Sequence, residues 1–162
     1  MAEHMVSDAP ATVLGPRLAA GVVAMVRARA GIRLDYLPGS LTLVDRIIDG
    51  MRRTDGSGAP AREVLLGFGA YTGQVLVGAA AAAWVDFGAD QRAMFGQPFG
   101  VITPDGRVWN PLGKAVKRYE NGAEDSLRLF CLSVAGRAAM RPPPDHGARG
   151  PRSGGAARSL GF

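Results

Sequence analysis

Two polar side chains that could hold a ligand lie inside a long uncharged stretch of this sequence. Tyr71 and Gln74 are three residues apart, so a helix would place them on one side. A phenol and an amide can orient a ligand through hydrogen bonds, although glutamine cannot act as a general acid or base. A buried amide also needs a partner, because an unmet one costs about 1–3 kcal/mol. We favour a structural role for both residues and keep them as ligand-binding candidates.

A basic cluster follows further along the chain. Lys114 and Arg118 are four residues apart on an expected helix, and Lys117 is adjacent to that side. Together they could grip an anion in a surface groove. A solvated charged face that complements the helix dipole is the simpler explanation. Trp109 could form a binding wall with Tyr119, or pack as an aromatic residue at the edge of the core.

The remaining reactive residue types form no catalytic or metal-binding set. His4 and His146 both lie in segments that we expect to be disordered. Cys131 sits on an apolar stripe without a charged neighbour, which indicates an inert core thiol. The G-x-G at 67–69 lies within a helical pattern rather than after a strand, so it does not predict a phosphate loop. We therefore predict no cofactor and no metal.

The long uncharged stretch runs from Val64 to Val85. Its length would suit a membrane-spanning helix, and Gly69 and Gly73 form a G-x-x-x-G pair. Its many small residues and central polar groups fit a protein core better, and its large apolar residues fall at helical spacing. We predict the buried central helix of a soluble domain, from about Ala61 to Ala83.

Length, charge and cysteine content limit the class of protein. At 162 residues the chain forms one domain with tails. Residues 137–162 hold five arginines and one aspartate, which leaves +1 of the net charge of +5 for residues 1–136. A nearly neutral domain argues against nucleic-acid binding. A single cysteine and the lack of a visible secretory signal predict a cytoplasmic protein. The arginine, alanine and glycine content suggests a GC-rich bacterial genome.

Turn and capping residues divide the chain into elements. The first four expected helices begin at Gly15-Pro16, at Ser40 as N-cap, at Ala61 and at Asn110-Pro111. The last one is capped either by Asn121 with Glu124 or by Asp125 alone. We expect the first helix to end at Gly31, the fourth at Asn121-Gly122 and the last at Gly136. The expected strands are 84–88, 93–95, 99–103 and 107–109, with a hairpin turn at 104–106.

These elements predict an α+β fold, with three or four helices packed on a small antiparallel sheet and with disordered termini. The single domain would span residues 14–137. Residues 1–13 would form a disordered leader, and residues 138–162 a disordered Arg/Gly/Pro-rich tail with too few large apolar residues to fold.

Four segments together resemble a family of small uncharacterised bacterial proteins: SLTLVDRIID at 40–49, GAYTGQVLVGAAAAAWV at 69–85, NPLGKAVKRYENG at 110–122 and EDSLRLF at 124–130. The family pattern is S-L-x-x-V-D, G-A-Y-x-G-E-V, a Trp, P-x-x-x-V-x-K-R and D-S-L. The resemblance covers about residues 34–132 and implies a soluble fold without a settled activity. Gln74 stands where the family has Glu, which removes a charge and favours a structural or recognition role.

Three hypotheses for function remain open. The first is a non-catalytic module that binds an unknown protein or small molecule. The second is a small enzyme for an anionic substrate, using Tyr71, a carboxylate such as Asp45 or Asp86, and the basic cluster. The third is a membrane protein anchored by the helix at 64–85. A pocket joining the polar groups would favour the enzyme, and burial of Tyr71 and Gln74 away from every cavity would argue against it.

Overall fold

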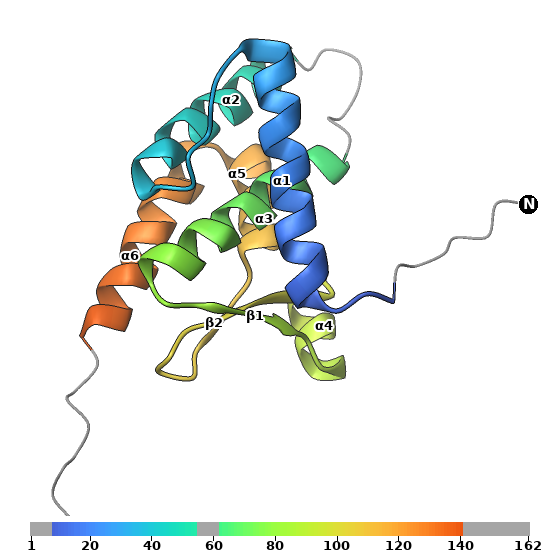
Figure 1. Ribbon diagram of the computed structural model, residues 1–162, viewed down its shortest axis with the longest axis vertical. Helices are drawn as coiled ribbons and strands as arrows, with labels where there is room; N and C mark the ends of the chain where they lie inside the picture. The colour runs from blue at the N-terminus through green and yellow to red at the C-terminus, as the bar shows by residue number, and fades with distance from the viewer. Residues whose placement is uncertain (1–7, 55–61, 141–162) are drawn as a thin grey trace, which may run out of the picture.

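The computed structural model describes residues 8–54 and 62–140, and this part of the chain folds as an α+β domain (Figure 1). It holds six α-helices, rather than three or four, and one three-stranded antiparallel sheet. The helices are α1 (Ala11–Ala30), α2 (Leu41–Thr54), α3 (Arg62–Ala79), α4 (Ala89–Phe95), α5 (Pro111–Asn121) and α6 (Leu127–Ala139). The strands are β1 (Ala83–Asp86), β2 (Phe99–Ile102) and β3 (Val108–Trp109), and the 3-10 turns are η1 (Pro38–Ser40) and η2 (Ala123–Asp125).

Helix α3 is the central element, as predicted. Most of its residues between Leu65 and Leu76 are buried, and it packs against α1, α5 and α6 (Figure 1). It ends at Ala79 rather than at Ala83. The N–H groups of Ala80 and Ala82 both donate to the carbonyl oxygen of Leu76, and Ala81 has a left-handed φ of 52°. This turn closes the helix, so that Ala83 already belongs to β1.

Glycines explain how α3 packs so closely. An ideal Cβ on Gly69 would lie 2.5 Å from the Cα of Leu112 in α5, and one on Gly73 would lie 2.5 Å from the indole of Trp84. The G-x-x-x-G pair therefore serves contacts within this chain, because a side chain at either position would overlap its neighbour.

Helix α1 begins earlier than the sequence indicated. It starts at Ala11, whose N–H donates to Asp86 Oδ1 over 3.1 Å, so Pro16 lies inside the helix instead of opening it. The carboxylate from β1 satisfies one of the free N–H groups at the helix start, which the local sequence could not reveal. The predicted leader thus extended too far at residues 11–13; residues 1–7 lie outside the described part. Gly31, with a φ of 68°, ends α1 as predicted.

In the described part of the chain, α1 is the helix that is long and apolar enough to cross a membrane, with a mean hydropathy of 1.3. Its length and composition alone give it this character, and 28% of an apolar 18-residue stretch of this helix is buried inside the domain. The stretch at 64–85, which the sequence offered as a possible anchor, forms the buried α3 and then β1.

The sheet lies across one end of the helices, in the order β1-β2-β3 (Figure 1). Trp84 of β1 pairs with Val101 of β2, which pairs with Trp109 of β3. The predicted turn at 104–106 is confirmed: the N–H of Gly106 donates to the Thr103 carbonyl over 2.9 Å, and Gly106 has a φ of 83°.

Two predictions are wrong here: the strand at residues 93–95, and the two ends of the last helix. Residues 93–95 belong to α4, because Gln91 Oε1 accepts the N–H of Gly88 at the start of this helix and left-handed Gly96 ends it. Helix α6 is capped by Ser126, whose Oγ accepts the N–H of Leu129 over 3.3 Å, and continues to Ala139. Asn121 and Asp125 bond to each other instead. By contrast, the predicted Asn110 cap of α5 is confirmed.

Candidate functional site

Arg118 is an interior residue rather than part of an exposed basic cluster. Its side chain is 2% exposed and its guanidinium Nε lies 3.0 Å from Asp45 Oδ1. The Nη2 group donates to Asp49 Oδ1 over 2.9 Å. A buried ion pair needs such partners because its charges have lost their water. Arg118 therefore stabilises the contact between α5 and α2 and is not placed to receive an anion from solvent.

The carboxylate of Asp45 also caps α6. It accepts the N–H of Leu127 over 2.9 Å, the N–H of Arg128 over 3.3 Å and the hydroxyl of Ser126 over 2.7 Å. The first turn of a helix has free N–H groups and a partial positive charge, so a carboxylate is stabilising there. Asp45 thus joins α2, α5 and α6 at one buried point.

The two lysines of the predicted cluster have different partners and surroundings from those of Arg118. Lys114 Nζ lies 2.5 Å from Asp125 Oδ1 and 5.9 Å from the centre of the Phe130 ring. This hydrogen bond, together with one from the Asn121 amide, lowers the pKa of the Asp125 carboxyl. Lys117 is exposed. The structure therefore does not assemble the three residues into one anion site.

Tyr71 is fully buried and occupies a structural hydrogen-bond chain. Its hydroxyl accepts the N–H of Tyr36 over 2.8 Å and lies 2.6 Å from Ser40 Oγ. Because Ser40 Oγ gives its hydrogen to the Leu37 carbonyl, Tyr71 is the donor to Ser40. Burial raises the pKa of the Tyr71 phenol, which keeps it neutral. Ser40 thus uses its hydroxyl to hold Tyr71.

Gln74 holds the indole of Trp84. Trp84 Nε1 donates to Gln74 Oε1 over 3.1 Å, and the indole is wedged between Gly15 and Gly73, where an ideal Cβ would lie 2.4 Å and 2.5 Å from it. An indole N–H can only donate, so it must meet the amide oxygen. The Gln74 Nε2 group consequently remains a donor without a partner in residues 8–54 and 62–140.

Trp109 is an aromatic residue at the edge of the core. Its Nε1 donates to Thr103 Oγ1 over 2.9 Å, and its ring meets Phe130 edge-on at a centroid distance of 6.2 Å. The hydrogen bond braces the β2–β3 hairpin internally, and the contact with Phe130 holds the hairpin against α6, which agrees with the structural alternative for Trp109.

The structure has a groove of about 420 Å³ that most of the predicted site residues do not line. It is lined by Pro16 of α1, Tyr36 of the loop before η1, and Gln74, Val77 and Gly78 of α3; we call it the Gln74 groove. Of the six candidates, only Gln74 lines it. Its lining combines apolar surface with two neutral polar groups, the Gln74 amide and the Tyr36 phenol.

Tyr36 is a polar residue of the groove that the sequence did not indicate as a site residue. Its φ of 62° is in the left-handed region, which costs a non-glycine residue of the order of 1 kcal/mol. The Tyr71 hydroxyl holds its N–H, and its ring stacks on Tyr71 at 5.0 Å. Asp35 Oδ1 accepts the N–H of Leu37, forming an Asx turn around Tyr36. In the sequence, Asp35 was the residue that could have indicated this turn. Burial raises the pKa of the Tyr36 phenol, which is therefore neutral at pH 7.

The described part of the chain gathers no group of three His, Cys, Asp or Glu side chains that could hold a metal ion. Comparisons with models of known protein families, with curated proteins and with solved structures find no match to this chain. The resemblance to the small bacterial family is therefore still a prediction.

Proposed function

We propose that this chain is a non-catalytic binding module whose ligand occupies the Gln74 groove. The observation that carries the proposal is the partially used amide of Gln74, a residue that lines the groove: its oxygen is fixed by Trp84, and its Nε2 donor has no partner in residues 8–54 and 62–140. A fixed donor beside apolar surface is the usual composition of a ligand site. The cytoplasm of a bacterium remains the expected setting.

The lining favours a neutral ligand that carries a carbonyl group. Gln74 Nε2 would donate to the carbonyl oxygen, while Tyr36 and Val77 would contact an apolar part of the ligand. None of the five lining residues is charged, so an ionised ligand would lose hydration without gaining an opposite charge. An amide-bearing aromatic molecule, or an exposed peptide segment, has the fitting chemistry.

The enzyme alternative has less support from the same geometry. Arg118 is paired with Asp45, Lys114 is paired with Asp125, and Tyr71 does not line the groove. An enzyme for an anionic substrate would need accessible cations beside a general acid or base. These residues instead support the fold.

Benzamide is a suitable probe because it combines a carbonyl, an amide and an aromatic ring. We expect titration of the full-length protein with millimolar benzamide to shift the backbone amide NMR signals of Tyr36, Gln74 and Gly78. Gln74→Glu is the matched variant, since its carboxylate still accepts the Trp84 indole N–H but has no donor for the ligand. We expect it to weaken benzamide binding at least fivefold. Equal binding by both proteins, or shifts that cluster elsewhere, would contradict the proposal.

A further inference from the structure

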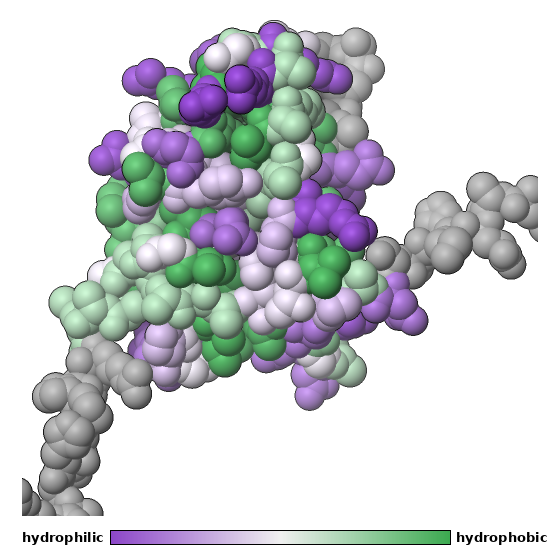
Figure 2. Space-filling view, viewed as in Figure 1, coloured by the Kyte–Doolittle hydropathy of each residue, from purple (hydrophilic) through white to green (hydrophobic). Residues whose placement is uncertain are grey.

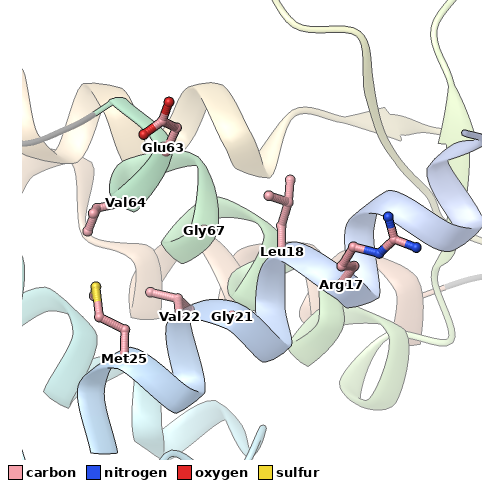
Figure 3. Close-up of a pocket in the computed structure, with 8 residues that line it drawn as sticks. All are labelled: Arg17, Leu18, Gly21, Val22, Met25, Glu63, Val64 and Gly67. Atoms are coloured by element: carbon pink, nitrogen blue, oxygen red, sulfur yellow. The ribbon is translucent and has the colours of Figure 1, made fainter. Parts of the chain in front are cut away.

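A second groove lies between α1 and the first turns of α3, away from the predicted site residues (Figure 3). Its volume is about 210 Å³, and we call it the α1–α3 groove. Leu18, Val22 and Val64 give it an apolar lining, and one glycine from each helix, Gly21 and Gly67, also lines it. Arg17 and Glu63 lie towards its opposite ends (Figure 3).

The two charges of the α1–α3 groove have no ion-pair partner among residues 8–54 and 62–140. Solvated surface charges are ordinary when they stand alone. Here a cation and an anion flank one apolar lining at a distance from each other. This arrangement is complementary to a surface that presents the same two charges in the reverse order.

The outer face of α1 could accommodate another helix at close range. Ala20, Gly21, Ala24 and Ala28 are exposed on it, and an ideal Cβ on Gly21 would meet nothing within 4 Å. In Figure 2, which has the same view as Figure 1, weakly hydrophobic residues follow the upper part of α1. Small side chains allow two helix backbones to approach closely, so this face could be covered without rearrangement.

We propose that a second copy of this chain covers the α1–α3 groove, forming a two-fold symmetric dimer. Two-fold symmetry reverses the order of the charges, so Arg17 meets Glu63 of the partner subunit and Glu63 meets Arg17 of the partner subunit. Both charges become paired while Gly21 lies near the axis. This inference is independent of ligand binding in the Gln74 groove.

Sedimentation equilibrium of the full chain at submillimolar concentrations tests the dimer. We expect a mass approaching twice the monomer mass of 16.9 kDa. Arg17→Glu and Glu63→Arg should each weaken the dimer about tenfold or more, because each replaces two attractions by two repulsions. The double variant Arg17→Glu/Glu63→Arg should restore it, since the order of the charges is again complementary.

Gly21→Leu provides a test that keeps the monomer intact. Its side chain has open space in the monomer but would block the approach of a second α1, so we expect a folded monomer. Gly50→Leu is the control, because Gly50 is another helical glycine without a neighbour within 4 Å, on α2. A monomeric wild type, a dimer that survives Gly21→Leu, or failure of the double charge reversal to restore the dimer would overturn the proposal. So would dissociation caused instead by Leu129→Gln/Leu132→Gln on the exposed face of α6.

Discussion

Asp45 Oδ1 and Arg118 Nε lie 3.0 Å apart in the interior, although 73 positions separate these residues in the sequence. The same carboxylate holds Ser126 and the first turn of α6, while Ser40, five residues before Asp45, holds the hydroxyl of Tyr71. The segments 40–49, 69–85, 110–122 and 124–130 are therefore connected through polar side chains. These hydrogen bonds form a network that holds the helices together.

Removal of Asp45 should be strongly destabilising. Asp45→Ala would leave the buried Arg118 charge and the start of α6 without their main partner, so we expect the free energy of unfolding to fall by about 3–5 kcal/mol. Asp49→Ala is the control, because Asp49 binds the same guanidinium but its side chain is 35% exposed; we expect a loss of about 1 kcal/mol or less. Urea denaturation followed by circular dichroism measures both. Equal losses of unfolding free energy in the two variants would contradict the role of Asp45 as the residue that joins α2, α5 and α6.

The glycines of α3 should respond in opposite directions to alanine. Gly69→Ala would push a methyl group against the backbone of Leu112, so we expect a loss of about 1–3 kcal/mol. Gly78→Ala meets nothing within 4 Å and should stabilise the domain by about 0.5–1 kcal/mol, because alanine favours the helix. Thermal unfolding of the two variants compares them directly. A stable Gly69→Ala protein would argue against the close approach of α3 and α5.

Gln74 should contribute modestly to stability. Gln74→Leu removes the acceptor of the half-buried Trp84 indole, so we expect a cost of about 1 kcal/mol. Gln74→Glu retains an acceptor and should cost less. Urea denaturation monitored by tryptophan fluorescence would measure the stability and report the surroundings of Trp84. The account would be contradicted if the leucine variant proved as stable as the parent and the glutamate variant less stable.

The ion pair between Lys114 and Asp125 predicts a loss of stability in acid. The folded state holds the pKa of Asp125 below its ordinary value of 3.8, so the contribution is fully present above that value. It is lost as the pH falls through the lower, folded-state pKa. We expect Asp125→Asn to be less stable than the parent at pH 7, by less than about 1 kcal/mol. That difference should shrink in unfolding experiments below about pH 4; a constant difference would contradict the assignment.

Local patterns were sufficient to predict α3, the 104–106 turn and the start of α5. Each depends on residues that are neighbours in the chain: apolar residues at helical spacing, Gly106 in a tight turn, and Asn110 before Pro111. The α+β class followed from these elements. The strand predicted at residues 93–95 was wrong although the signals for α4 are local too: Gln91 reaches back to Gly88 at the start of this helix, and Gly96 ends it.

The candidate site was harder to predict, because its residues are positioned by distant partners. Arg118 looked like an exposed cation from its spacing, and only the fold brings Asp45 to it. Tyr36 takes its unusual backbone conformation with support from Tyr71, which follows 35 positions later. Gln74 was recognised as a polar residue in an apolar helix, but its remaining donor became evident only once Trp84 was placed against its oxygen.

The most direct test of the proposed binding module is a measurement of intermolecular NOEs between benzamide and the full-length protein. We predict NOEs from the benzamide ring protons to the methyl groups of Val77 and to the ring of Tyr36, with much weaker signals in Gln74→Glu. NOEs to Met25 in the α1–α3 groove, or to the side chain of Lys117, would contradict ligand binding at the Gln74 groove.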